Sequence, residues 1–492
     1  MACAAYLARA GVKTLVLERR ELIGGAAVSE GVWPGWKVST ASYVCSLLHP
    51  RITNELKLAS FGYDAYVKDP HSFNPLADGR SLLLSSNDEQ NEKEIAAFCT
   101  RDVEGFKAFD RRASALGTSV YDAMLLADDQ LAAAGRSLKA AYAESAAQLV
   151  ERYVETPVLQ AALVNDGLVG TFAGPKTPGT AHVLAHHYAG RAFGRQGAWG
   201  YVRGGMGSVS QALAAAARAA GADIATQSDV AAITVCRNRS TGVVLGDGTE
   251  LEARAILSNA DPKTTFLKLT PPGVFRDDFI ERVRGWRCEG VSLKVNLALG
   301  ELPEFAARPT RGRPGPHHRA SIHIAPTVDY LQDAYEDARG GNDSRAPLLE
   351  CFLQTPTDPT IAPAGKHLLS IFAQYFPYGK EPGAWTDRRR ELAADTVVNA
   401  LAPFAPNVPN AIEGRQVLAP PDLEQRFGLW GGHIFHGELL PDQIFDKRFG
   451  SRTPLRGLYL CGSGAHPGGC VSGAPGMRAA QATIADLKTG LL

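Results

Sequence analysis

The last thirty-five residues of the chain constrain its fold most. They open with a short apolar strand, Leu458 to Cys461, and end in an alanine-rich helix that runs to about Lys488. The loop between strand and helix contains Gly462, Gly464, Gly468, Gly469, Gly473 and Gly476. Such a turn lets backbone N–H groups and the positive end of a helix approach an anion closely. The segment therefore predicts an anion-binding turn, and a plain glycine-rich connection is the alternative.

The N-terminal residues form a second informative pattern. Met1 to Ala10 has strong helix propensity, Gly11 stands where a helix ends, and Thr14 to Glu18 is an apolar strand that ends in an acid. This order is the second half of a dinucleotide-binding βαβ unit, in which the acid binds a ribose hydroxyl. The glycines of that unit lie about 20 residues before the acid. We therefore expect them upstream of residue 1, or else lost from this chain.

A glycine pair follows the acidic strand. Arg19 and Arg20 come first, either as solvated residues or as neighbours of an adenosine or phosphate, and Gly24, Gly25 and Ala26 come next. Here the sequence resembles the flavin-dependent phytoene desaturase and amine oxidase superfamily. Its members carry a strand, a glutamate, a few residues and then a Gly-Gly pair in contact with FAD. The resemblance implies that an FAD site includes Glu18, Arg19, Gly24, Gly25 and Ala26.

A second glycine pair strengthens this resemblance. Gly204, Gly205 and Met206 precede an alanine-rich helix, Ser208 to Ala220, where chains of the superfamily return from the substrate domain to the cofactor. The short strands between Asp223 and Ser258 resemble the meander and returning strand of a flavoprotein Rossmann fold. The resemblance implies that Val230 lies on the adenine side.

The C-terminal loop indicates a branch of the superfamily. Leu458 to Gly469 (LYLCGSGAHPGG) resembles the pyridine nucleotide-disulphide oxidoreductase domain-containing protein 2 branch. The resemblance implies that Gly462 and Ser463 lie along the pyrophosphate or ribityl chain of FAD, and that Gly473 and Ala474 lie at the reduced flavin. Where another glycine is expected the chain has Cys470, which would crowd the flavin edge.

We therefore predict an α/β fold in which a Rossmann-like FAD-binding domain, without its first strand and glycine loop, interleaves with an α+β substrate domain. Thr14 to Glu18 and Leu458 to Cys461 should share one parallel sheet. The predicted FAD-binding parts are residues 1–70, 201–262 and 444–492. The predicted substrate parts are a helical region, 71–200, and an antiparallel sheet with helices, 263–443.

Histidines are the remaining candidates for chemistry. His182 and His186 would share one helix face, but Val183 replaces the glutamate of a zinc protease motif, so no metal is expected. His433 and His436 lie in the segment from Gly431 to Glu438, and we favour structural roles for both.

Composition excludes several classes of function. Lys plus Arg and Asp plus Glu each number 51, so no charge field favours nucleic acid. Eight cysteines without a C-x-x-C pair argue against a disulfide scaffold, a zinc ribbon and a dithiol redox centre. No apolar run is long enough to span a membrane. We expect a soluble protein of the cytoplasm, or of the mitochondrial matrix in a eukaryote.

The function implied by the resemblance is an FAD-dependent oxidoreductase that moves a hydride between an apolar, isoprenoid-like small molecule and flavin. The sequence identifies neither catalytic residues nor the electron acceptor. One alternative is a non-catalytic relative with a regulatory or interaction role after loss of the phosphate loop. Another is a carotenoid ketolase or isomerase on the same fold.

Overall fold

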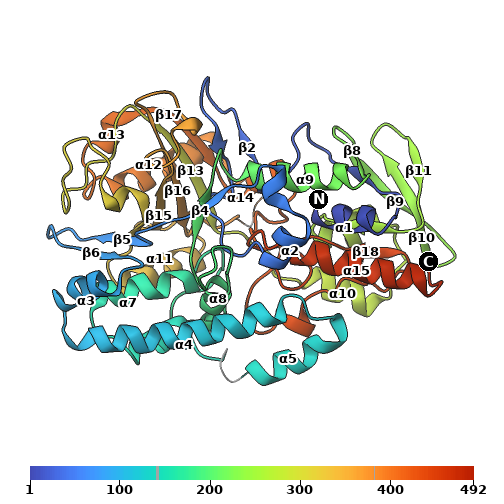
Figure 1. Cartoon of the computed structure of the whole chain (residues 1–492), viewed down its shortest axis with the longest axis horizontal. Helices are drawn as coiled ribbons and strands as arrows, with labels where there is room; N and C mark the ends of the chain where they lie inside the picture. The colour runs from blue at the N-terminus through green and yellow to red at the C-terminus, as the bar shows by residue number, and fades with distance from the viewer. Residues whose placement is uncertain (140–142, 380, 382) are drawn as a thin grey trace.

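The computed structural model describes residues 1–139, 143–379, 381 and 383–492. Two regions lie side by side in it (Figure 1). The first contains a seven-stranded mixed sheet with helices above and below, and we call it the sheet half. The second contains short parallel strand pairs near the helices that begin and end the chain, and we call it the Rossmann-like half.

The sheet half combines strands from distant parts of the sequence. Its order is β17 (Ile412–Leu418), β13 (Ser292–Leu299), β16 (His367–Gln374), β15 (Leu348–Leu353), β14 (Ser321–Ile324), β5 (Ser72–Pro75) and β6 (Ser81–Leu84). All neighbours are antiparallel except β14 and β5, which are parallel. Strands β5 and β6 form a hairpin that turns at Asp78-Gly79, and β6 is one edge of this sheet.

Strand alternation gives this sheet two different faces. Leu293, Val295 and Leu297 of β13 point into a hydrophobic core, whereas the residues between them point to the other face. The core is covered by α12 (Asp387–Leu401). Thr386 caps this helix, because its hydroxyl oxygen accepts a hydrogen bond of 3.2 Å from Arg389 N.

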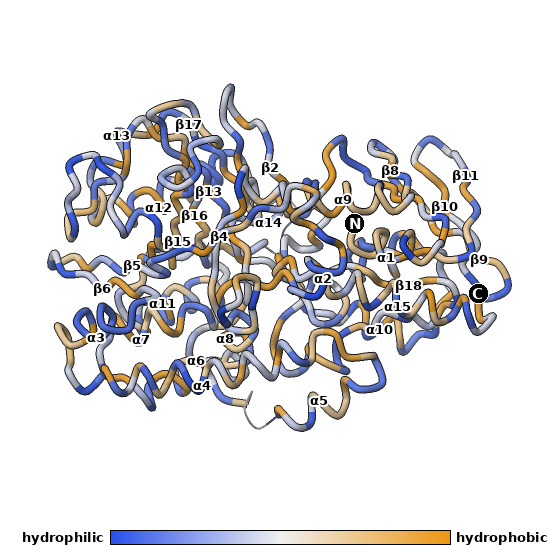
Figure 2. The backbone as a smooth tube through the Cα atoms, in the orientation of Figure 1, coloured by the Kyte–Doolittle hydropathy of each residue, from blue (hydrophilic) through white to orange (hydrophobic). Residues whose placement is uncertain are grey.

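A helical layer lies on the opposite side of the sheet. It includes α3 (Asp88–Ala96), α4 (Arg101–Ala123), α6 (Ala146–Glu151), α7 (Pro157–Val164), α8 (Thr180–His187) and α11 (Val328–Arg339). The short helix α5 (Leu131–Leu138) follows α4 and lies beneath the Rossmann-like half. Hydrophobic and hydrophilic residues alternate along α4 (Figure 2), as expected for a helix with one buried face. All of these helices except α11 lie within residues 71–200, for which a helical region was predicted.

The Rossmann-like half packs three helices against two strand pairs. The N-terminal helix α1 (Ala2–Arg9) lies between α9 (Gly207–Ala219) and α15 (Ala474–Lys488). The strand β1 (Leu15–Leu17) pairs in parallel with β8 (Asp223–Ala225), and β12 (Ile256–Ser258) pairs in parallel with β18 (Leu458–Leu460). The predicted meander is β9 (Val230–Cys236), β10 (Arg239–Leu245) and β11 (Glu250–Glu252).

One expectation about this half was wrong. We expected the first and last strands in one parallel sheet, but β1 and β18 belong to separate two-stranded sheets, and no described strand hydrogen-bonds to both. Residues of β1 and of β12 line the same cavity, which therefore reaches both strand pairs. The parallel pairing and the interleaved sheet agree with the predicted fold class.

Short elements complete the fold: β2 (Ser29–Glu30), β3 (Val38–Ser39), α2 (Pro50–Glu55), β4 (Ala65–Val67), β7 (Gly200–Val202), α10 (Asp277–Arg284), α13 (Val408–Ala411) and α14 (Pro420–Phe427), with single turns at Leu58–Phe61, Asp128–Gln130, Asn165–Gly167, Thr264–Leu269, Pro316–Arg319, Pro359–Ile361 and Phe445–Lys447. Among the residues described, no helix combines the length and apolar character needed to cross a bilayer.

Candidate functional site

One large cavity connects the two halves. Its volume is about 1520 Å³, enough for a dinucleotide and a further organic molecule. At one end it is lined by the strand pairs and glycine loops of the Rossmann-like half. At the other end its floor is the polar face of the seven-stranded sheet.

Most of the residues predicted from the sequence gather at the Rossmann-like end. Glu18 follows β1 and lines the cavity, and its Oε1 accepts a hydrogen bond of 2.9 Å from the backbone N of Arg20. Arg19 also lines the cavity and donates to the carbonyl of Gln425. The predicted residues that line the cavity are Glu18, Arg19, Gly24, Gly25, Ala26, Val230, Gly462, Ser463 and Gly473.

Four predicted residues lie off the cavity lining. The backbone N of Gly204 donates to Asp358 at 2.7 Å, and that of Met206 donates to Ser39 at 3.0 Å. Gly205 lies between them, and Ala474 is fully buried. These N–H groups have protein partners, and FAD contact by any predicted residue stays a prediction.

The last helix points its N-terminus at the cavity. Gly473 precedes α15 in a left-handed conformation with φ 73°, and Pro475 and Gly476 in its first turn line the cavity. The positive end of this helix therefore faces the space where an anionic group would lie. Cys470 also lines the cavity, and its Sγ is 4.0 Å from Nε2 of His187. Burial raises the pKa of this thiol to about 12.

The sheet end of the cavity carries a row of side chains that the sequence analysis missed. Lys294 of β13 pairs in register with Phe372 of β16, Phe372 with Glu350 of β15, and Glu350 with His323 of β14. All four line the cavity and are at most 6% exposed. Adjacent strands are about 4.8 Å apart, so the row extends across the cavity floor.

Hydrogen bonds from three sides fix Glu350. Asn165 Nδ2 donates to Oε1 at 2.6 Å, Tyr43 OH donates to Oε2 at 3.3 Å, and His323 Nε2 lies 3.3 Å from Oε1. Burial alone would raise the pKa of Glu350, but the hydrogen bonds from His323 and Asn165 and the nearby histidine charges hold it below its ordinary value. His323 Nδ1 is buried without a hydrogen-bond partner in the described structure.

Lys294 has no carboxylate partner within ion-pair distance in the part of the chain described. Its Nζ donates to Asn296 Oδ1 at 2.8 Å and to Ser370 Oγ, and it lies 4.9 Å from the centre of the Tyr43 ring. Burial lowers the pKa of Lys294 to about 7, because the charged form loses its hydration. A buried lysine in this state can accept a proton near neutral pH.

Further titratable groups surround this row. Lys68 donates to the carbonyl of His71 and to Ser321 Oγ, both at 2.5 Å. Burial lowers the pKa of Lys68 to about 8, although the charges of Glu350 and Asp166 oppose this shift. Burial also raises the pKa of Asp166. All these residues line the cavity, so its sheet end is rich in buried charge.

The residues at the Rossmann-like end fit FAD, the cofactor that the resemblance implies. A Cβ atom built on Gly25 would meet no protein atom within 4 Å, so the backbone there borders free space. Gly462 brings the loop after β18 against Asn259, where a Cβ would lie only 2.7 Å from the Asn259 carbonyl oxygen. Glu18 would hold the adenosine ribose, and the start of α15 would face an anionic part of the cofactor.

The three histidines of α8 are neighbours, with ring centroids 6.3 Å apart for His182 and His186 and 6.1 Å apart for His186 and His187, but their environments differ. His182 and His186 are buried among aromatic residues, and His187 lines the cavity. Burial lowers the pKa of His182 to about 3. Of the Gly431–Glu438 segment, His436 lines the cavity whereas His433 is fully buried off it.

Known proteins place the chain in a family. The family model described as flavin containing amine oxidoreductase matches residues 1–484. The rat (Rattus norvegicus) pyridine nucleotide-disulfide oxidoreductase domain-containing protein 2 is 38% identical over 533 residues, with 99% of this chain and 92% of that protein covered. A lycopene-forming phytoene desaturase of Pseudescherichia vulneris is 26% identical, with 99% and 96% covered.

A solved structure supports the fold. A triple mutant of putrescine oxidase, made in a redesign of cofactor binding, matches with a TM-score of 0.62 at 15% identity, with 99% of this chain and 96% of that chain covered. The predicted resemblance and fold class are thereby confirmed. The chain belongs to the flavin-containing amine oxidoreductase family and is an FAD-dependent oxidoreductase.

Proposed function

We propose that the enzyme transfers a hydride between FAD and a mainly apolar, isoprenoid-like organic substrate that carries one hydroxyl or amine next to the reacting carbon. The observation that carries this proposal is the row Lys294, Phe372, Glu350 and His323 on the cavity floor. A substrate made only of hydrocarbon would leave His323 Nδ1 buried without a hydrogen-bond partner in the described structure, and such burial is costly.

Apolar side chains near this row support the apolar part of the substrate. Phe106, Leu163, Val169, Phe352 and Phe372 line the same end of the cavity. The similarity to a phytoene desaturase, whose name indicates an isoprenoid substrate, supports the same class. Polar groups placed among aromatic walls are typical of sites that orient one functional group of a small molecule.

Bound FAD supplies the hydride acceptor. In the oxidising direction Lys294 Nζ would accept the O–H or N–H proton of the substrate while the hydrogen on the adjacent carbon leaves as a hydride to that acceptor. Neutral Lys294 suits this role because Asn296 and Ser370 accept its two N–H groups and leave the lone pair free. The substrate would then leave as a carbonyl or imine, and Lys294 would hold the proton.

Family membership favours an enzyme over the non-catalytic relative. A carotenoid ketolase or isomerase stays an alternative prediction, since it shares the fold. The ketolase or isomerase would not require a proton acceptor beside the substrate carbon, so the role of Lys294 distinguishes it from our proposal.

The test uses flavin reduction without oxygen. We expect geraniol, an isoprenoid alcohol, to bleach the visible flavin absorbance of the enzyme, and a hydrocarbon terpene without the hydroxyl not to. Lys294→Met should slow this reduction by about 100-fold or more, as expected for loss of a general base. Lys366→Met is the matched control. Lys366 directly precedes β16, pairs with Glu413 and lies off the cavity lining.

Two results would contradict the proposal. One is equal reduction by the alcohol and the hydrocarbon. The other is an unchanged rate in Lys294→Met with normal FAD content.

A further inference from the structure

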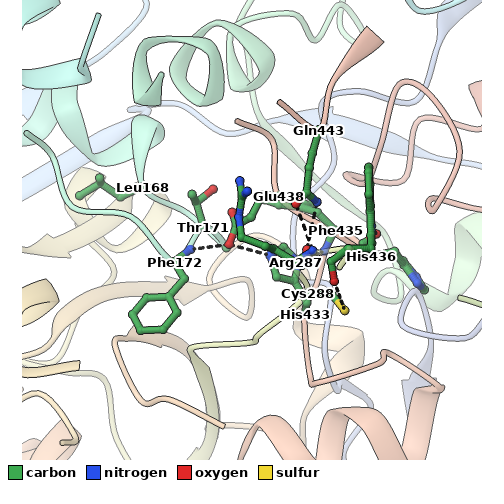
Figure 3. A network of polar contacts seen from close by, with 12 residues as sticks. Leu168, Thr171, Phe172, Arg287, Cys288, His433, Phe435, His436, Glu438 and Gln443 are labelled. Atoms are coloured by element: carbon green, nitrogen blue, oxygen red, sulfur yellow. Dashed lines mark hydrogen bonds and ion pairs between the residues drawn. The ribbon is translucent and has the colours of Figure 1, made fainter. Parts of the chain in front are cut away.

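The loop from Gly431 to Glu438 is held rigidly between the two halves. Glu438 Oε1 accepts a hydrogen bond of 3.1 Å from Phe172 N and lies 3.3 Å from His433 Nε2 (Figure 3). Trp286 Nε1 donates to the carbonyl of His436 at 3.0 Å. Partners from separate segments therefore fix both the end and the centre of this loop.

His436 has an unusual backbone conformation in this loop. Its φ is 55°, in the left-handed region, where a residue with a side chain is strained by about 1–3 kcal/mol. Gly437 follows with φ 122° and packs so closely on Trp286 that a Cβ would overlap the indole ring. Strain of this kind persists where the surroundings enforce it, and it is concentrated at ligand sites.

The side chain of His436 is anchored at one nitrogen and available at the other. Its Nδ1 lies 3.0 Å from Oδ2 of Asp261, a residue with 0% exposure. Asp261 is itself fixed, because Oδ1 accepts a hydrogen bond of 2.8 Å from Lys263 N. Within the described residues Nε2 makes no hydrogen bond. The side chain of His436 is 13% exposed and lines the cavity.

Asp261 and His436 lie at the Rossmann-like end of the cavity and not at its sheet end. Asp261 lies just beyond the carboxyl end of β12, where Asn259 and Ala260 line the cavity. Arg448 Nη2 donates to Ser463 O at 2.9 Å and to His436 O at 3.4 Å, so it ties the loop after β18 to the loop that carries His436. Phosphates of dinucleotides bind at the carboxyl ends of parallel strands.

We propose that His436, held through Nδ1 by Asp261, binds the anionic diphosphate of FAD through Nε2. In this arrangement Nδ1 donates one hydrogen bond to Asp261, and Nε2 donates one to a phosphate oxygen of the cofactor. The fully buried guanidinium of Arg448 adds a second cation beside the same loop. Asp261 is the positioning residue, and His436 is the residue that contacts the ligand.

The test compares two flavins that differ in the diphosphate. Binding of FAD and of riboflavin to the flavin-free full chain is measured by quenching of flavin fluorescence. In His436→Asn we expect FAD to bind about 10-fold more weakly, the loss expected for one charge-assisted hydrogen bond, and riboflavin to bind unchanged. Asparagine is chosen because it tolerates the left-handed backbone. His367→Asn, off the cavity, should change neither affinity.

A second measurement needs no variant. In the wild-type chain, diethyl pyrocarbonate should modify His436, as mapped by mass spectrometry, and inorganic pyrophosphate or FAD should protect it whereas riboflavin should not. Equal weakening of FAD and riboflavin in His436→Asn, unchanged FAD affinity, or equal protection by riboflavin would each overturn the proposal. Absence of any saturable FAD binding by the folded wild-type chain would overturn it as well.

Discussion

The two ends of the cavity are built in different ways. At the Rossmann-like end, glycines, strand termini and the start of α15 form the walls, so the backbone is the main binding surface. At the sheet end, the backbone is fully paired in the seven-stranded sheet and side chains such as Lys294 and Glu350 form the surface. The comparison indicates that the Rossmann-like end is specified by chain geometry and the sheet end by side-chain identity.

This difference has a consequence for how the two ends tolerate change. On a strand, alternate residues face opposite sides, so Lys294 can be replaced without altering Leu293 or Val295 in the core beneath it. A change in the glycine turns moves the backbone itself. We therefore expect substitutions at the sheet end to alter chemistry more than folding, and those at the glycine turns to alter both.

The largest effect on stability is expected at the Rossmann-like end, for Gly24→Val. Gly24 has φ 130°, and a Cβ there would lie 2.6 Å from the carbonyl oxygen of Ala27 and 2.9 Å from Ser210 Oγ. Backbone strain and overpacking together should lower the free energy of unfolding by about 3–5 kcal/mol. Urea denaturation measures this loss, and flavin quenching should show FAD binding lost with it.

Gly62→Val is the matched control for that variant. Gly62 has φ 89°, but a Cβ there meets no atom within 4 Å. Backbone strain alone should therefore lower the free energy of unfolding of Gly62→Val, by about 1–2 kcal/mol, and FAD affinity should be unchanged. Equal losses of unfolding free energy in the two variants would mean that the close packing of Gly24 does not shape the Rossmann-like end.

A smaller effect is expected at the sheet end, for Glu350→Gln. This change removes the charge that Asn165, Tyr43 and His323 surround, and should cost about 2 kcal/mol of stability near neutral pH. The folded pKa of Glu350 lies below its ordinary value of 4.5. Ionised Glu350 therefore contributes its full stabilisation of the fold above pH 4.5, and this stabilisation is lost as the pH falls through the folded pKa.

The measurement is urea denaturation of Glu350→Gln and wild type at neutral and at acid pH. The difference in stability should shrink at acid pH while FAD affinity stays at the wild-type value. Glu413→Gln removes an exposed carboxylate paired with Lys366, and should change stability by less than about 1 kcal/mol at either pH. A loss of FAD affinity in Glu350→Gln would show that the two ends are coupled, contrary to the comparison.

Which residues line the Rossmann-like end was largely predictable from the sequence because the signals there are local. Glu18 ends an apolar strand, and Gly462 and Gly473 bracket a strand-to-helix turn, so short segments define where each lies. The same local signal was less informative at Gly204 and Met206. A glycine pair before a helix suits close packing of the protein as well as a ligand, and here Asp358 and Ser39 bind the N–H groups.

The sheet end was not predictable because its geometry depends on strand register. Lys294, Glu350 and His323 come from three separate strands, and each alone resembles an ordinary polar residue on an amphipathic strand. Only the pairing of β13, β16, β15 and β14 aligns them in one row. A one-residue shift in register would move any of them to the core face, and no local pattern specifies that register.

The smallest effect is expected for Glu18→Ala, which tests whether a single side chain matters at an end built mainly of backbone. Glu18 is half-buried and contacts the backbone N of Arg20, so stability should change by less than about 1 kcal/mol. If Glu18 binds the adenosine ribose, FAD should bind about 10-fold more weakly. FMN, which lacks the adenosine, should bind as it does to wild type. Unchanged FAD affinity would remove Glu18 from the cofactor site and leave that end defined by backbone alone.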